Sequence, residues 1–140
     1  ALAHEIAVNH LDNVVKVFQE TGTVWENYAP ESVSPGNISK GDFVGWTGLP
    51  PVAILFEYVF GLRPDVPNGR ILWDIRLLEE HGVSRYPYGK QGLLELQCAR
   101  RRFETEEPMI TARSNVPVEL VVRWAGGSKA LDLGEEQIMV

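Results

Sequence analysis

Carboxylates and aromatic rings are concentrated in one stretch of the sequence, residues 23–46. The stretch combines Glu26, Glu31 and Asp42 with Trp25, Tyr28, Phe43 and Trp46. Carboxyl groups can donate or accept protons, and flat rings can cover the faces of a ligand. Prolines and glycines break any regular period here, which predicts a long loop, and such a loop is often functional. The same residues also fit a solvated loop whose rings pack against helices, so both interpretations stay open.

Two short motifs in this stretch resemble segments of a known enzyme family. They are Trp25-Glu26-Asn27-Tyr28, within residues 20–31, and Phe43-Val44-Gly45-Trp46-Thr47. They resemble the Trp-Glu-x-Tyr and Phe-Gly-Trp-Ser/Thr segments at the end of the catalytic (α/α)6 barrel in glycoside hydrolases of the trehalase and family-63 type, including mannosylglycerate hydrolases. Val44 is an extra residue in the second motif. The resemblance covers about residues 1–62, and the remainder resembles the small β extension that follows the barrel in some relatives.

The resemblance implies a sugar site with a role for each of five residues. These enzymes invert the anomeric centre: one carboxylic acid protonates the leaving oxygen and a carboxylate activates water. Glu26 matches the position of that general base. Trp25, Tyr28 and Trp46 would form the wall that faces the sugar, and Asp42 would bind a sugar hydroxyl or hold the loop.

The general acid of the family lies in an earlier loop of the barrel, upstream of residue 1. We therefore expect a fragment of, or a protein derived from, an inverting glycosidase without activity of its own. Glu31 or Asp42 could stand opposite Glu26, so whether the chain is an enzyme stays open. The alternatives are a stand-alone, non-catalytic carbohydrate-binding or self-associating module, and a globular domain with no retained activity.

Two helices are expected to position this loop. Apolar residues recur every three or four positions over residues 2–21, which predicts an amphipathic helix that stops at Thr21-Gly22. A second helix is predicted over residues 47–61, with Thr47 as a possible N-cap and Gly61 at its end. That helix is apolar on nearly every face, so we expect it to be buried on most sides. Because one other helix cannot cover it, we expect a homo-oligomer or a missing upstream barrel.

The remainder of the chain predicts β structure. Strand patterns occur at residues 71–77, 92–99, 109–113, 118–124 and 138–140. Helices followed by strands favour an α+β fold with a small antiparallel sheet or sandwich. The predicted domains are residues 1–62, helical, and residues 63–140, rich in β structure.

Composition excludes several functions. The net charge of −6 argues against a nucleic-acid partner, and the cluster Arg100–Arg102 is followed by acidic residues, which predicts a solvated loop. No apolar run is long enough for a membrane span. The histidines, such as His10, lack metal-site spacing, so we expect neither a metal nor another cofactor. Cys98, the single cysteine, is expected to be a buried thiol and fits a reducing compartment such as the cytoplasm.

Overall fold

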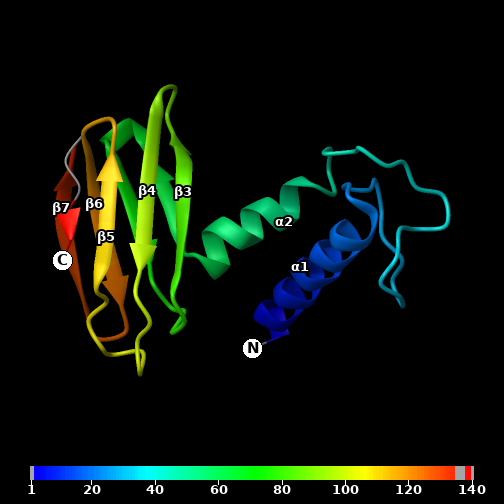
Figure 1. Cartoon of the computed structure of the whole chain (residues 1–140), viewed down its shortest axis with the longest axis horizontal. Coiled ribbons are helices and arrows are strands. Elements are labelled where there is room, and N and C mark those ends of the chain that lie inside the picture. The colour runs from blue at the N-terminus through cyan, green and yellow to red at the C-terminus, as the bar shows by residue number, and fades with distance from the viewer. Residues whose placement is uncertain (1, 135–137, 140) are drawn as a thin grey trace. The chain divides into compact units, whose positions relative to one another are not determined.

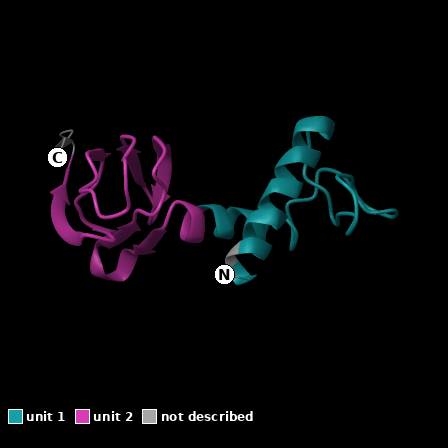
Figure 2. Cartoon of the chain, turned by 90° about the horizontal axis from the view of Figure 1, so that it is seen from below, with its two compact units in different colours: residues 1–55 teal, residues 56–140 magenta. Residues whose placement is uncertain are grey.

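The computed structural model of the protein describes residues 2–134 and 138–139 (Figure 1). The chain divides into two compact units, Ala1–Leu55 and Phe56–Val140, which Figure 2 shows in different colours. The first unit contains helices and a long loop, and the second contains two sheets. The predicted α+β fold is confirmed. The predicted domain division at residue 62 stays a prediction.

The first helix, α1 (Leu2–Thr21), has the predicted boundaries. Its buried face includes Val14 and Val17, which are 6% and 0% exposed. The helix ends where Gly22 adopts a φ of 75° and donates its N–H to the carbonyl of Phe18 at 2.7 Å. Glycine tolerates this left-handed conformation without steric cost, so the predicted stop is confirmed.

The second helix is shorter than predicted. The α-helical part, α2 (Leu49–Ala53), continues as a π-helical segment, η1 (Ile54–Val59). Thr47 is not the N-cap. That position belongs to Gly48, which makes no side-chain cap, because the Thr47 hydroxyl instead donates to the Trp25 carbonyl at 2.8 Å. Leu49 is 65% and Val52 51% exposed, so the described part of this chain does not supply the burial expected for the helix. The expected homo-oligomer or missing upstream barrel stays a prediction.

The second unit contains two four-stranded sheets, with strand orders β1-β2-β6-β7 and β3-β4-β5-β8. Neighbouring strands are antiparallel except β2 and β6, which are parallel and form the one parallel pair among the described strands. The strands are β1 (Leu62–Asp65), β2 (Arg70–Asp74), β3 (His81–Tyr88), β4 (Gly92–Cys98), β5 (Ile110–Ser114), β6 (Val118–Trp124), β7 (Gly127–Leu133) and β8 (Ile138–Met139), with a short 3-10 helix, η2 (Val66–Asn68), before β2.

The five predicted strands correspond to β2, β4, β5, β6 and β8, although Val140 lies outside the described residues. Three strands, β1, β3 and β7, were not predicted. β1 contains Pro64, which is tolerated because the strand lies at the edge of its sheet. β3 has a register shift between Val83 and Tyr86, which interrupts its alternation.

One hydrophobic core joins the two sheets. Trp73 of β2 and Leu120 of β6 come from one sheet, and Leu96 of β4 and Ile110 of β5 come from the other; each is at most 1% exposed. Along β4, buried and exposed residues alternate strictly, as a strand with one core-facing side requires. The predicted sandwich arrangement is therefore present, and the buried Cys98 belongs to this core as expected.

The arginine cluster is not solvated throughout. Arg101 is 4% exposed, and its guanidinium donates to the backbone carbonyls of Ile75, Leu77, Glu104 and Glu106. The prediction of a solvated loop fails at this residue because two of the four carbonyls that bind it, those of Ile75 and Leu77, belong to a distant part of the chain. Arg100 and Arg102 are exposed, as predicted.

Candidate functional site

The long loop of the first unit is ordered by its own backbone. Residues 23–29 run beside residues 34–43 and exchange hydrogen bonds with them. Glu26 N donates to Lys40 O at 2.8 Å, Phe43 N to Val24 O at 3.0 Å and Gly36 N to Asn27 O at 3.1 Å. The residues of both predicted motifs are thus held in one folded segment.

Asp42 participates in holding this loop. Its backbone has a φ of 53°, which is uncommon outside glycine but tolerated by aspartate. The Thr23 hydroxyl donates to Asp42 Oδ1 at 2.6 Å and accepts the Asp42 N–H at 2.9 Å. These contacts match one of the two roles expected for Asp42. Its sugar-binding role stays a prediction.

Trp25 and Tyr28 lie together, as a shared wall requires. The Trp25 N–H donates to the Tyr28 hydroxyl at 3.2 Å, and its indole Nε1 donates to the Thr21 hydroxyl at 2.9 Å. Through the bond from Thr47, Trp25 is also tied to the residues just before α2. Trp25 is therefore fixed to the end of α1, to the loop and to the start of the second helix.

Trp46 is placed differently. It is 65% exposed, and its ring packs edge-on against Phe43, with centroids 4.8 Å apart. One face of an indole at this exposure is open to solvent. A flat, exposed ring of this kind can pack against the apolar face of a sugar.

Glu26 has a fixed backbone and an unengaged side chain. The side chain is partly buried, but its carboxylate has no hydrogen bond or ion pair with any residue that the structure describes. Neither Glu31 nor Asp42 is bonded to it. Glu26 is therefore free to receive a ligand, a property that it shares with many surface glutamates.

A depression lies between α1 and the loop, with a volume of about 570 Å³. Of the five predicted site residues, it contains Tyr28 alone. Its wall includes Asn9, His10 and Asn13 of α1 together with Glu31 and Thr47. His10 Nε2 is buried and has no partner within the described part of the chain. Because buried polar atoms are nearly always paired, this nitrogen is available to a ligand or a water molecule.

The α1 residues in this depression are not among the predicted site residues. The spacing of the histidines bears only on metal binding, and it does not fit a pair of metal ligands. The i, i+4 spacing of Asn9 and Asn13, beside His10, places three polar side chains near one face of the helix. That spacing is the signal that could have identified this wall.

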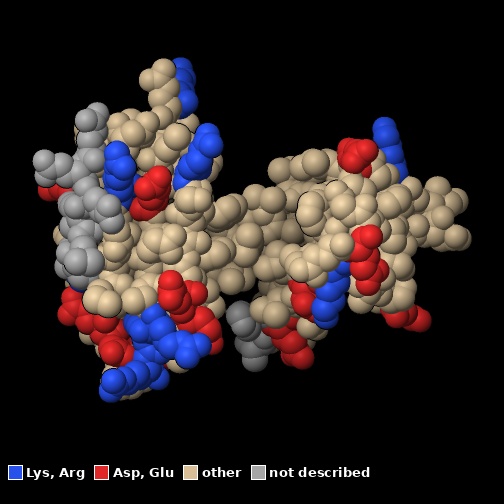
Figure 3. Space-filling view, viewed as in Figure 1, with Lys and Arg blue, Asp and Glu red and all other residues tan. Residues whose placement is uncertain are grey.

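Charges of both signs are mixed on one face of the molecule. On the face shown in Figure 3, Lys and Arg side chains lie next to Asp and Glu side chains. Among the residues with described positions, no group of His, Cys, Asp and Glu could hold a metal ion. None of the helices in that part of the chain has both the length and the apolar character needed to cross a membrane.

Comparison with known proteins identifies a family for the first unit. Residues 1–55 match the family model of the glycosyl hydrolase family 63 C-terminal domain, which confirms the resemblance predicted from the two motifs. No curated protein and no solved structure matches the chain. The matched range coincides with the first compact unit and includes the whole aromatic loop. The first unit of this protein is therefore related to the C-terminal domain of glycosyl hydrolase family 63.

Proposed function

We propose that the first unit derives from an inverting glycoside hydrolase, that Glu26 occupies the position of its general base, and that the chain hydrolyses no glycoside on its own. The family relation of residues 1–55 supports the derivation. The observation that carries the proposal is the state of Glu26: its backbone is fixed by Lys40, and its carboxylate is unengaged among the described residues.

Inversion needs a second carboxyl group. The two carboxyl groups stand about 6.5–9.5 Å apart, so that a water molecule fits between the base and the sugar. Asp42 is bonded to Thr23, and Glu31 lines a depression that Glu26 does not. Because the hydrogen bond occupies Asp42 and the depression beside Glu31 excludes Glu26, we propose that a different polypeptide segment supplies the acid.

A sugar would contact the aromatic part of the loop. Trp46 offers an exposed ring, and Tyr28 connects Trp25 to the depression that contains His10. A ring face and several hydrogen-bonding groups are what a pyranose requires. We propose weak sugar binding here without turnover.

An activity assay tests the proposal directly. The full chain is incubated with aryl glucosides, trehalose and mannosylglycerate, beside Glu26→Gln and a control, Glu20→Gln, at an exposed position of α1. We expect no turnover from any of the three proteins. Turnover by the natural chain and by Glu20→Gln, but not by Glu26→Gln, would overturn the proposal of an incomplete reaction centre.

A binding measurement tests the retained sugar site. Trp46→Ala should weaken the binding of trehalose, measured by NMR titration, by roughly 2- to 10-fold, the range expected when an aromatic contact is lost. The control is Ile38→Ala, at a residue of the same loop that is 89% exposed. Equal affinities of the natural chain and Trp46→Ala would exclude Trp46 as part of a sugar site.

An apolar groove favours a second candidate, a self-associating module. The groove lies within the first unit, between α1 and α2, and has a volume of about 480 Å³. Val15, Phe18 and Val52 line it and are 45–51% exposed. Contiguous apolar surface of this kind often marks an interface.

Solution mass separates the two candidates. A self-associating chain should be an oligomer by light scattering, and Val15→Asp should dissociate it because a charge would enter the interface. Gln19→Asp, at an exposed position of the same helix, should leave the oligomer intact. A monomer at high concentration would eliminate the second candidate.

A further inference from the structure

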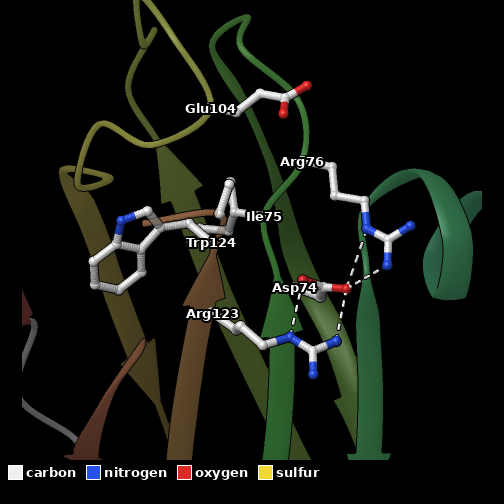
Figure 4. Close-up of a pocket in the computed structure, with 7 residues that line it drawn as sticks. Asp74, Ile75, Arg76, Glu104, Arg123 and Trp124 are labelled. Atoms are coloured by element: carbon white, nitrogen blue, oxygen red, sulfur yellow. Dashed lines mark hydrogen bonds and ion pairs between the residues drawn. The ribbon is translucent and has the colours of Figure 1, made fainter. Parts of the chain in front are cut away.

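A pocket in the second unit lies where the parallel strands β2 and β6 end. Asp74 and Arg123 are register partners near the carboxyl ends of these strands, so their side chains lie on the same face of the sheet. The pocket has a volume of about 370 Å³, within the range of about 300–1,000 Å³ that is usual for small-molecule sites. Arg76, Glu104 and Trp124 complete its polar and aromatic lining (Figure 4).

A single carboxylate holds two guanidinium groups in this pocket. Asp74 Oδ2 accepts Arg76 Nη2 at 2.7 Å and Arg123 Nη2 at 2.9 Å. The two Nε atoms donate to the same carboxylate, each at 3.2 Å. Because both Nη2 atoms lie within hydrogen-bond distance of one oxygen, the guanidinium groups are held close together, as Figure 4 shows.

Much of each guanidinium remains available. Asp74 has a side chain only 9% exposed, whereas the side chains of Arg76 and Arg123 are 65% and 49% exposed. Each uses its Nε and Nη2 atoms for Asp74 and keeps its Nη1 atom unbonded among the described residues. Two guanidinium groups on one carboxylate leave an excess of one positive charge, which suits one further anionic group.

Glu104 limits what that anion can be. Glu104 lines the same pocket, and its carboxylate has no partner in the described ranges. A phosphate, with close to two negative charges, would be repelled by it more strongly than a carboxylate. Hydroxyl groups, by contrast, would donate to Glu104. The ligand should therefore carry one carboxylate at one end and hydroxyl groups at the other.

The pocket is rigidly supported. Arg101 donates to the carbonyls of Ile75 and Glu104, two residues that line it. Trp124 is partly buried and pairs with Gly127, the first residue of β7, where a Cβ atom would come within 3.3 Å of the indole. A site that is ordered before the ligand arrives loses less entropy on binding.

We propose that this pocket binds a sugar acid of monosaccharide size, with Arg76 and Arg123 holding its carboxylate and Glu104 accepting its hydroxyl groups. The site is built from second-unit residues alone and does not depend on Glu26 or on any glycosidase activity. A sugar acid can bind both the two guanidinium groups and Glu104, whereas a neutral sugar provides no anionic group for Arg76 and Arg123.

The proposed sugar-acid site can be tested by NMR titration of the full chain with glucuronate, glucose and glucose 6-phosphate at low ionic strength. Glucuronate should shift the Nε–H signals of Arg76 and Arg123 and the indole N–H signal of Trp124 in a saturable manner. Its affinity should exceed that of glucose by about tenfold or more, the gain expected from charge-assisted hydrogen bonds. Equal affinity for glucose, tighter binding of glucose 6-phosphate, or no saturable shift at tens of millimolar would each overturn the proposal.

Variants locate the site. Arg76→Gln should weaken glucuronate binding by about tenfold or more, and Arg123→Lys, which keeps the charge but loses the planar fork, should also weaken it. Lys90→Gln removes the same charge at an exposed position between β3 and β4 and should change the affinity less than twofold. Glu104→Gln should shift the preference towards glucose 6-phosphate. If Arg76→Gln, shown by circular dichroism to be folded, binds glucuronate as the natural chain does, the assignment is wrong.

Discussion

Replacing Arg101 with methionine should destabilise the second unit severely. The guanidinium makes four hydrogen bonds, all to backbone carbonyls: Nη1 to Glu104 and Glu106 at 3.0 and 3.1 Å, and Nη2 to Ile75 and Leu77 at 3.1 Å each. It thereby ties the segment after β2 to the segment that joins β4 and β5. Methionine fills similar space with an unbranched apolar chain and donates no hydrogen bond.

The size of the effect follows from these four bonds. A hydrogen bond to a charged group contributes about 1.5–3 kcal/mol, but most of these carbonyls are only partly buried and would regain water. Arg101 Nε has no partner among the described residues, so burying it already carries a cost. We therefore expect a loss of about 3–5 kcal/mol, well below the sum of the bonds but a large part of the roughly 5–15 kcal/mol that stabilises a typical domain.

The assay is equilibrium unfolding in urea, followed by circular dichroism and by tryptophan fluorescence, to which the buried Trp73 contributes. Arg100→Met and Arg102→Met are matched controls, because they make the same chemical change at exposed neighbours and should cost less than about 0.5 kcal/mol. A loss below about 1 kcal/mol for Arg101→Met would refute the reasoning, because the carbonyls would then be satisfied equally well by water. Equal losses in all three variants would instead point to a general charge effect.

Three further predictions concern the second unit. The hydrogen bond from Arg123 lowers the pKa of Asp74 below its ordinary 3.8, against the opposing effect of burial. As the pH falls, the carboxylate of Asp74 is protonated in the unfolded state before it is protonated in the folded state, so the stability that Asp74 provides is present above pH 3.8 and is lost below it. Asp74→Asn should therefore flatten the acid part of a curve of unfolding free energy against pH. An unchanged slope would contradict the assignment. Gly61→Ala should lower the melting temperature far more than Gly69→Ala. Both glycines have φ above 60°, but only at Gly61 would a Cβ atom lie 2.1 Å from the carbonyl oxygen of Asp74. Similar losses in both variants would show that the backbone adjusts. Burial raises the pKa of the Cys98 thiol, so a disulfide reagent should modify it only as fast as the second unit opens, and immediate reaction in native buffer would disprove its burial.

The helical end of the chain could be predicted well because its signals are local. The repeat of apolar residues in α1 and the glycine after it lie within one segment, and both boundaries were correct. The second helix was predicted too long because Thr47 was assigned to capping. Its hydroxyl bonds to Trp25 instead, a contact between residues 22 positions apart that no local pattern contains.

Strands with buried apolar residues on one side could be predicted from the sequence. Strands that are recognisable only by their hydrogen bonds to a neighbouring strand could not. Alternation marked β4 and β6, whose inward residues are buried. The sequence of β7, Gly127–Leu133, has few apolar residues because the strand is at the edge of its sheet, and only its pairing with β6 defines it. The parallel pairing of β2 with β6 was likewise not predictable, since spacing along the chain does not indicate strand direction.

The candidate sites show the same division. The aromatic loop was found because its motif is continuous in sequence, and the contacts of Trp25, Tyr28 and Asp42 now explain how it is held. The pocket around Asp74 was not found, because Asp74 and Arg123 are 49 positions apart and have no meaning as a pair until the strands align. Arg101 was misjudged for the same reason.

The pairing of β2 with β6 also has a consequence for biosynthesis. β1 and β2 can form their hairpin as soon as they leave the ribosome, but the other edge of β2 stays open until β6, 49 residues later in register, has been made. During that interval Ile71 and Trp73 lack the neighbours that bury them in the finished sheet. Closing so long a loop is slow, and an open apolar edge is where nascent chains adhere to one another. Premature termination before residue 118 should therefore yield a product that aggregates rather than a smaller folded domain.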